Sequence, residues 1–337
     1  MSTPRESQRI VIAGASSLLG AELKSLLEES RFASWDLSLV DEETAVGTLT
    51  EAGGEPAVIQ PVEEGTFARA KIIFFAGSPA FSERNLPAAR DSGAFVIDLS
   101  GAALNVDHAR LWFALDDVAE VSPPRKTLYA VPSAAGLVAG KLLDALGRAA
   151  LSRLAIVFFR PVSEAGRTGI EELEAQTSQL LSFQSVGQPI FDTQVAFNLL
   201  DHFGAASREN LKAVRDRIRR EASSAAAQSV PATKVLPSIQ VLHAPVFYGY
   251  TFVANSELKP GQTREALVEI LRKSGFSLEI AESSPLGNVV AAGDSAVHLA
   301  LPEDDPAQPG TWWLWGAAHN IRLPAATAIK LAEKLVA

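Results

Sequence analysis

A short apolar run that passes directly into a glycine-bounded turn constrains the fold of this chain more than any other feature of its sequence. Residues 9–13 read RIVIA, and residues 14–20 read GASSLLG. Leucines then recur at the spacing of a helix face, at Leu18, Leu19, Leu23, Leu26 and Leu27. A strand, a tight turn and a helix in this order are typical of the first unit of a doubly wound parallel sheet.

The same pattern continues through the first third of the chain. Apolar strands are predicted at residues 35–40, 71–75, 94–99 and 128–131, and a helix at residues 83–91. Strands that are apolar on both faces and alternate with helical stretches indicate a parallel sheet covered on each side. We therefore predict a Rossmann-like domain over residues 1–132, to which residues 317–337 return with an amphipathic last helix at about 324–336.

Residues 133–316 have a different pattern. Helices are predicted at residues 134–150 and 168–181, a strand at 154–159, a loop rich in Ala, Ser and Pro at 222–234, and strand-like alternation within 235–258 and 278–299. This pattern predicts a second α/β (α+β) domain with a mixed or antiparallel sheet. The clustered Trp312, Trp313 and Trp315 are interpreted as core or interface packing, with a pocket lining as the alternative.

The composition excludes several classes of function. The 337 residues include no cysteine, so the chain has no disulfide, no thiolate metal site and no thiol nucleophile. The net charge of −9 repels a polyanion, so we expect no nucleic-acid partner and interpret the mixed charges of Lys212–Arg220 as a solvated helix face. The five histidines are scattered without metal-ligand spacing, so we expect no metal.

Residues 1–9 are polar and lack the apolar core of a signal peptide, and no apolar run reaches the length of a membrane span. We therefore expect a cytoplasmic protein without a membrane partner.

The glycine-bounded turn lies where a dinucleotide-binding loop belongs, and it is predicted to bind a cofactor through Gly14, Ser16, Ser17, Leu18, Leu19 and Gly20. Gly14 would permit the tight turn, and Gly20 would permit close helix–strand packing. Ser17 stands where a glycine usually lets the backbone approach the phosphates. Asp41, 21 residues beyond Gly20, can bind a ribose 2′-hydroxyl and repel a 2′-phosphate, which favours NAD over NADP. The alternative is a nucleotide-free domain whose acids only cap a strand.

One segment resembles a known enzyme family. Residues 158–181, FFRPVSEAGRTGIEELEAQTSQLL, are similar to the aspartate-β-semialdehyde dehydrogenase segment T-Y-Q-A-V-S-G-A-G-x-x-G-I-E-E-L and the Gln-Thr pair that follows it. Three further blocks agree in order: the glycine loop at 14–20, FDTQVAFN at 191–198 with the family's A-F-N region, and GAAHN at 316–320 with G-A-A-x-N. The block HAPVFYGYT at 243–251 is similar to the family's R-V-P-V-x-x-G-H-S/T.

The resemblance implies an oxidoreductase of amino-acid biosynthesis with a Rossmann-like cofactor domain and a dimerisation domain containing a large sheet. It therefore implies a homodimer that takes a small-molecule ligand and NAD or NADP. In the family a cysteine attacks the aldehyde, hydride passes to NADP, and phosphate releases an acyl phosphate, with a histidine as acid and base.

The catalytic positions implied by the resemblance carry other residues here. Ser133 falls at the nucleophile, Tyr250 at the acid/base histidine, Arg160 at the active-site glutamine and His243 at the substrate-binding arginine. A serine needs an adjacent base, and a tyrosine is protonated near neutral pH. Leu104 falls at an arginine implicated in phosphate binding.

The remaining implied ligand residues are Lys212 for substrate, which lies four residues before Asp216, and Ser163 and Asn320 for the cofactor. Glu164 replaces a glycine of the cofactor-contacting segment, and Trp315 replaces a basic residue. The leading hypothesis is a homologue that keeps the fold but not the thiol-dependent activity. The alternatives are an enzyme with a remodelled pocket around Ser133, Tyr250, His243 and Arg160, and a non-catalytic binding or regulatory dimer.

Overall fold

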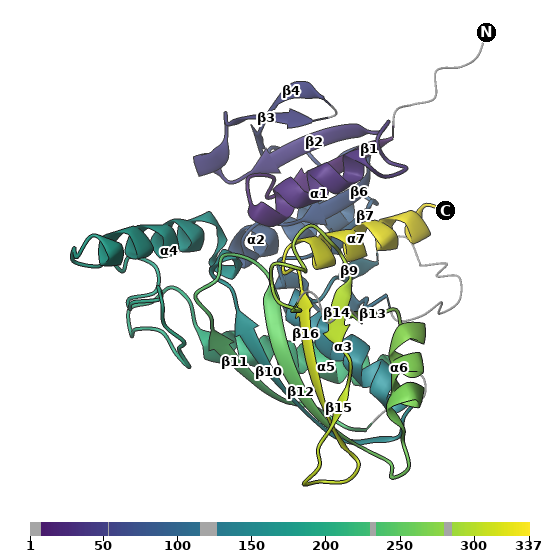
Figure 1. The fold of residues 1–337 in the computed structure, drawn as a ribbon. Helices are drawn as coiled ribbons and strands as arrows, with labels where there is room; N and C mark the ends of the chain where they lie inside the picture. Colours follow the sequence, from purple (N-terminus) through teal and green to yellow (C-terminus); the bar gives the residue numbers. More distant parts are fainter. Residues whose placement is uncertain (1–7, 53, 115–126, 230–233, 280–284) are drawn as a thin grey trace. The chain divides into compact units, whose positions relative to one another are not determined.

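The chain divides into two compact units. The computed structural model describes residues 8–52, 54–114, 127–229, 234–279 and 285–337 (Figure 1). Unit 1 comprises Met1–Pro132 and Pro324–Ala337, and unit 2 comprises Ser133–Leu323. The chain thus returns to unit 1 after residue 323, whereas the sequence placed the return at residue 317. The difference arises because the last strand of unit 2 continues to Ala318 and the side chain of Asn320 bonds within unit 2.

Unit 1 contains a seven-stranded sheet in the order β5-β2-β1-β6-β7-β9-β8, and every strand pair in it is parallel. The strands are β1 (Arg9–Ala13), β2 (Asp36–Asp41), β5 (Gln60–Pro61), β6 (Ala70–Phe75), β7 (Phe95–Asp98), β8 (Arg110–Leu111) and β9 (Leu128–Ala130). The helices are α1 (Leu18–Glu28), α2 (Pro79–Asp91) and α7 (Arg322–Leu335), with the 3-10 turns η1 (Glu43–Ala45) and η2 (Ala102–Asn105) and the hairpin β3 (Leu49–Ala52) and β4 (Glu55–Val58). The prediction of a Rossmann-like parallel sheet is confirmed.

The central strands of this sheet are buried on both faces, which explains their uninterrupted apolar sequence. Val11 and Ile12 on β1 and Ile72–Phe75 on β6 have at most 1% of their surface exposed. Residues 1–7, which belong to the polar N-terminal segment, and the segment 122–126 lie outside the described residues.

Unit 2 contains a mixed sheet in the order β11-β10-β12-β16-β14-β13, with β15 paired to β16. The strands are β10 (Leu151–Arg160), β11 (Ser238–His243), β12 (Tyr250–Leu258), β13 (Ser277–Glu279), β14 (Val297–Ala300), β15 (Glu303–Asp304) and β16 (Thr311–Ala318). The helices are α3 (Ala134–Gly147), α4 (Gly166–Leu181), α5 (Leu211–Gln228) and α6 (Arg264–Lys273), with the 3-10 turn η3 (Val162–Ala165). Helices α3 and α5 pack together and cover one face of this sheet (Figure 1).

The prediction of a loop at residues 222–234 is wrong for residues 222–228, which continue α5. Alanine has the highest helix propensity, and the small side chains of Ala222, Ala225 and Ala226 are buried where α5 meets α3. The hydroxyl of Ser223 bonds back to the carbonyl oxygen of Arg219 at 2.9 Å, so this serine does not interrupt the helix. Residues 230–233 lie outside the described part of the chain.

Among the described residues, none of the helices has the length and apolar character needed to cross a membrane. The same residues contain no group of three or more metal-ligating side chains arranged to hold an ion.

Candidate functional site

The glycine turn of unit 1 is built by close backbone contact. Gly14 has a φ of 95°, and a Cβ added to it would lie 2.0 Å from the backbone nitrogen of Gly77. A Cβ on Gly77 would in turn lie 3.1 Å from the Cα of Gly14. Ser17 caps α1, since its hydroxyl accepts from the Gly20 N–H at 2.8 Å and donates to the carbonyl oxygen of Ala76 at 2.8 Å.

The start of α1 suits a pyrophosphate group. N–H groups in the first turn of a helix have no acceptor within the helix, and at α1 these belong to Leu18 and Leu19. Such N–H groups and the helix dipole attract anions. The predicted loop residues therefore lie together at one helix N-terminus, and their backbone fits the phosphates of a dinucleotide.

Asp41 also joins this loop. One of its carboxylate oxygens accepts from the backbone N–H of Ser16 at 2.7 Å, and the other accepts from the N–H of Glu42 at 2.8 Å. The carboxylate of Glu42 accepts from the hydroxyl of Ser78 at 2.7 Å. Asp41 at the end of β2 thus holds the loop at Ser16, and Glu42 holds Ser78, the N-cap residue of α2.

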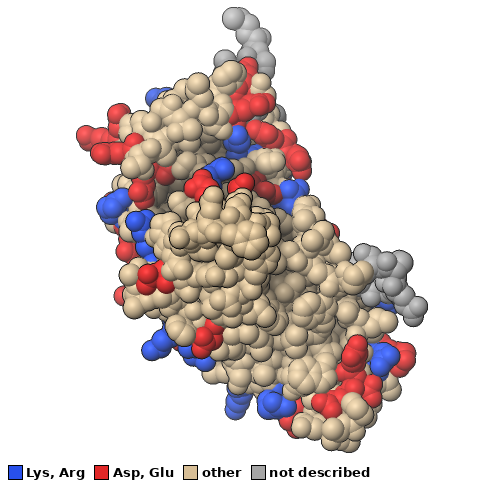
Figure 2. Space-filling model, turned by 60° about the vertical axis from the view of Figure 1, so that its left-hand side comes forward, with Lys and Arg blue, Asp and Glu red and all other residues tan. Residues whose placement is uncertain are grey.

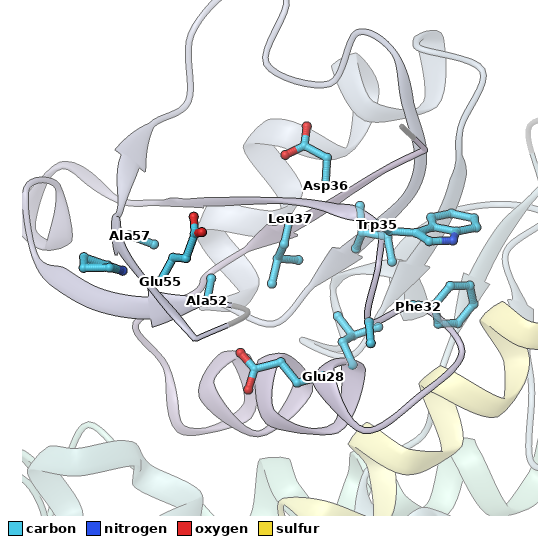
Figure 3. Close-up of a pocket in the computed structure, with 12 residues that line it drawn as sticks. Glu28, Phe32, Trp35, Asp36, Leu37, Ala52, Glu55 and Ala57 are labelled. Carbon is cyan, nitrogen blue, oxygen red and sulfur yellow. The ribbon is translucent and has the colours of Figure 1, made fainter. Parts of the chain in front are cut away.

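A cavity of about 350 Å³ lies elsewhere in unit 1. It is formed by α1, β2 and the β3–β4 hairpin, with Phe32, Trp35 and Leu37 along one wall and Glu28 and Glu55 at its rim (Figure 3). It opens at the first residues of β2, whereas the glycine turn follows the last residue of β1. The cavity is therefore separate from the predicted cofactor loop.

In unit 2 three of the predicted site residues, Arg160, His243 and Tyr250, gather at one end of the sheet. Ser133 instead precedes α3, and Lys212 lies on α5. Arg160 ends β10 and pairs in register with His243, which ends β11. Tyr250 begins the antiparallel β12 and pairs with Ala318 on β16, two residues before Asn320. The ends of four strands therefore deliver these polar side chains to the same edge.

Ser133 caps the N-terminus of α3 and is held by a buried carboxylate. Its hydroxyl donates to Glu221 of α5 at 2.6 Å and accepts from the N–H of Gly136 at 3.1 Å, and its own N–H donates to Glu221 at 3.0 Å. Glu221 is fully buried and is also paired with Arg217 at 2.9 Å. A Cβ on Gly136 would lie 2.0 Å from the Glu221 carboxylate, so only glycine permits this approach.

Arg160 is 3% exposed and pairs with Glu209 through an Nη2–Oε2 distance of 2.6 Å, while its Nε–H has no hydrogen-bond partner within the described part of the chain. Burial acts to lower its pKa, but the interactions with Glu209, Tyr250 and Glu164 outweigh burial and raise it. The guanidinium is therefore a permanent buried cation.

Tyr250 is 1% exposed, and its hydroxyl donates to the carboxylate of Glu164 at 3.1 Å. Burial, and then the negative charge of Glu164, raise the pKa of Tyr250 well above its ordinary value. The amide of Asn320 donates to the other oxygen of Glu164 at 3.1 Å and to the hydroxyl of Ser163 at 3.0 Å. The implied cofactor residues Ser163 and Asn320 thus bond to each other and to Glu164.

His243 lies beside the packed rings of Phe191 and Phe203, whose centroids are 6.0 and 5.6 Å from its own and 4.8 Å from each other. It is 1% exposed, and its Nε2–H donates to the carbonyl oxygen of Val195 at 3.1 Å. Burial lowers its pKa to about 4; the charge of Arg160 also lowers it, against the opposing effect of the Val195 bond. His243 is therefore neutral near pH 7.

Two buried side chains of α4 organise the segment that contacts His243. Glu172 accepts from the N–H of Ile190 at 2.6 Å, and the amide oxygen of Gln176 accepts from the N–H of Val195 at 2.7 Å. Burial raises the pKa of Glu172. Sequence reasoning noted the Gln176-Thr177 pair only as part of the resemblance and did not assign it this function.

Two carboxylates that bond to the implied site positions have no place in the sequence predictions: Glu221, which bonds to Ser133, and Glu209, which pairs with Arg160. The i, i+4 spacing of Arg217 and Glu221 was the available signal for one of them. Lys212 lies exposed on α5, and Asp216 pairs with Arg219 at 3.2 Å. Leu104 lies in η2 of unit 1.

Both halves of the chain match known family patterns. Residues 9–136 match the pattern "Semialdehyde dehydrogenase, NAD binding domain", and residues 142–323 match "Semialdehyde dehydrogenase, dimerisation domain". The chain belongs to the semialdehyde dehydrogenase family. The resemblance found in the sequence is thereby confirmed.

Individual members of the family match over nearly the whole chain. A USG-1 protein homolog of Azotobacter vinelandii is 28% identical, and an aspartate-semialdehyde dehydrogenase of Rickettsia bellii is 25% identical, each over 97% of both chains. A solved structure of a probable aspartate-semialdehyde dehydrogenase from Pseudomonas aeruginosa is 26% identical, with a TM-score of 0.85 over 98% of this chain and 99% of that one.

The buried His243 predicts a loss of stability in acid. Its pKa of about 4 lies below the ordinary value of about 6.5, so between these pH values the unfolded chain binds a proton that the folded chain does not. The neutral, buried state of His243 contributes fully to the free energy of unfolding above pH 6.5, and this contribution decreases as the pH falls toward 4. At pH 5 it is smaller by about 2 kcal/mol. Denaturant unfolding of the wild type and of His243→Gln at pH 7 and pH 5 measures this change in the free energy of unfolding.

The His243→Gln variant is expected to lose about 2 kcal/mol less than the wild type over this interval. The matched control is His202→Gln, since His202 is exposed, and it should lose as much as the wild type. Equal losses for all three proteins would contradict this assignment.

Proposed function

We propose that this chain is a semialdehyde dehydrogenase homologue that has lost the thiol-dependent oxidation of an aldehyde to an acyl phosphate. The observation that carries the proposal is the state of Ser133, the residue at the implied nucleophile position. Its hydroxyl donates to Glu221 and accepts from Gly136, which is the hydrogen bonding of a helix cap. A serine nucleophile must instead transfer its proton to a base during attack.

The nearby groups do not supply that base. Glu221 is within reach, but its carboxylate is held by Arg217 and the N–H of Ser133. The raised pKa of Tyr250 keeps its hydroxyl protonated at neutral pH. These contacts support loss of the family reaction.

The alternative, an enzyme with a remodelled active site, has less support from the hydrogen bonds of the structure. That hypothesis required hydrogen bonds among Ser133, Tyr250, His243 and Arg160. In the described residues, Ser133 bonds instead to Glu221, and Tyr250 bonds to Glu164. His243 bonds to Val195, and Arg160 bonds to Glu209.

We propose further that unit 1 binds NAD in preference to NADP. The carboxylate of Asp41 lies against the loop of Ser16, and Glu42 is beside it. A 2′-phosphate placed here would meet two carboxylates, whereas a ribose hydroxyl would find an acceptor. When bound, the dinucleotide would supply hydride chemistry; the residues of this loop would hold and orient its phosphates and ribose.

A homodimer is the third part of the proposal. The face of the unit 2 sheet opposite α3 and α5 bears the apolar side chains of Val157, Phe159, Val253, Trp313 and Trp315, which are partly or largely exposed. Figure 2 shows a broad area of surface with few charged side chains. An apolar face of this kind on a domain of the dimerisation family fits a second copy of the chain.

Loss of the family reaction predicts a negative assay. With aspartate semialdehyde, phosphate and either dinucleotide, the wild type should reduce the dinucleotide below about 10⁻³ s⁻¹, against a typical enzyme value of about 10 s⁻¹. Ser133→Cys supplies a thiol but not the family's acid/base histidine, whose implied position holds Tyr250, and should stay within tenfold of the wild type. Ser178→Cys, on the exposed face of α4, controls for a thiol elsewhere. Turnover by the wild type at ordinary rates would refute the proposal.

Calorimetric titration tests the cofactor preference. NAD is expected to bind at least about tenfold more tightly than NADP, because one added charge beside a carboxylate costs on the order of 1–4 kcal/mol. Asp41→Asn keeps an acceptor for Ser16 and should reduce the difference, whereas Glu43→Gln, at an exposed position, should not. Tighter binding of NADP, or no binding of either at millimolar concentration, would contradict the preference.

Sedimentation velocity tests the dimer. Val253→Glu places a charge in the middle of the apolar face and should convert the dimer to monomer, since burying an unpaired carboxylate is costly. Val58→Glu, at an exposed apolar position of unit 1, should leave the dimer intact. A wild type that sediments as a monomer at micromolar concentration would rule out the homodimer.

A further inference from the structure

The Glu164 carboxylate has the contacts of a bound ligand, although it belongs to the chain. One oxygen accepts from the hydroxyl of Tyr250 at 3.1 Å, and the other accepts from the amide of Asn320 at 3.1 Å. Its two oxygens thus bridge donors from the beginning of β12 and the end of β16. Hydrogen bonds from a hydroxyl and an amide to the two oxygens of a carboxylate are a common way in which proteins bind small anions.

The two donors are fixed independently of Glu164. Asn320 is 3% exposed, and its amide oxygen accepts from the N–H of Gly249 at 2.9 Å while its nitrogen also donates to Ser163. Tyr250 is 1% exposed, and its ring lies edge-on to Phe158 with centroids 5.9 Å apart. Both donors would therefore keep their positions if the carboxylate were removed.

A buried cation completes the surroundings. Arg160 is 3% exposed, its charge interacts with that of Glu164, and its Nε–H has no hydrogen-bond partner among the residues that the structure describes. Glu209 accepts from its Nη2 at 2.6 Å. The other charge acting on Tyr250 is that of Arg217. Both arginines are themselves ion-paired, Arg160 with Glu209 and Arg217 with Glu221. A small anion would therefore restore only the charge that is lost when the Glu164 carboxylate is removed.

The side chain of Glu164 is the removable part of this arrangement. The backbone of η3 is held through Val162 and Ser163, whose N–H groups donate to the carbonyl oxygens of Val246 at 3.0 Å and Phe247 at 3.1 Å. The Glu164 side chain itself is only partly buried. Shortening it would leave the backbone in place and open a space beside Tyr250 and Asn320.

We propose that Arg160, Tyr250 and Asn320 form an anion-binding site in which Glu164 is the tethered ligand, and that a small monocarboxylate occupies this site when the Glu164 side chain is absent or displaced. The proposal goes beyond the function above, since it concerns recognition by unit 2 alone and holds with or without dinucleotide binding. The site selects a planar carboxylate because its donors approach two oxygens of one group.

Thermal unfolding of the full chain with added acetate tests the site. Glu164→Ala should unfold at a lower temperature than the wild type, and acetate should raise its Tm saturably, by about 3 °C at ten times the dissociation constant. Chloride at equal ionic strength and acetamide, the neutral analogue, should not reproduce the shift. The wild type should not respond, because its own carboxylate fills the site.

Two further variants complete the experiment. Glu171→Ala removes an exposed glutamate from α4 and should show no acetate response. Glu164→Ala combined with Tyr250→Phe lacks one donor, so its acetate response should fall at least about fivefold in apparent affinity.

A folded Glu164→Ala protein with no acetate shift beyond that of the wild type and Glu171→Ala would overturn the proposal. Should Glu164→Ala not fold, Glu164→Ser keeps a polar group for the Asn320 amide and takes the same titration. The same two results then decide: a selective acetate shift supports the site, and its absence overturns it.

Discussion

The buried carboxylate of Glu221 at the start of α3 is the interaction on which the candidate site depends. It satisfies the N–H and hydroxyl of Ser133, is neutralised by Arg217, and lies against the bare Cα of Gly136. Removing one partner of a buried ion pair typically destabilises a protein by about 3–5 kcal/mol. The position that the family resemblance assigns to the nucleophile is therefore a point at which two helices are joined.

Polar side chains at the strand ends of the unit 2 sheet are likewise paired with other residues of the chain. Arg160 has Glu209, Tyr250 has Glu164, and each of these pairs is internal to unit 2. Polar groups taken from water must find partners, and the carboxylates of this cluster find them in the chain. Such a cluster is stable without a substrate, in contrast to an active site that leaves groups poised for one.

Local sequence patterns predicted the glycine turn and the alternation of strands and helices, because these depend on neighbouring residues. The partner of Ser133 lies 88 residues away and could not be inferred from spacing alone. The end of α5 was mistaken for a loop because Ala and Ser in sequence resemble a linker, and only the surface of α3 shows why short side chains are needed there. The burial of His243 likewise depends on Phe191 and Phe203, which no local pattern connects to it.

The backbone contact between Gly14 and Gly77 has an evolutionary consequence. A side chain at Gly14 would strike the nitrogen of Gly77, and one at Gly77 would press on both the Cα of Gly14 and the ring of Phe81. Gly14 cannot acquire a larger residue as a first step, whereas a larger residue at Gly77 would require the Gly14 backbone and the Phe81 ring to shift. Two turns that are 63 residues apart in the chain therefore restrict each other's substitution.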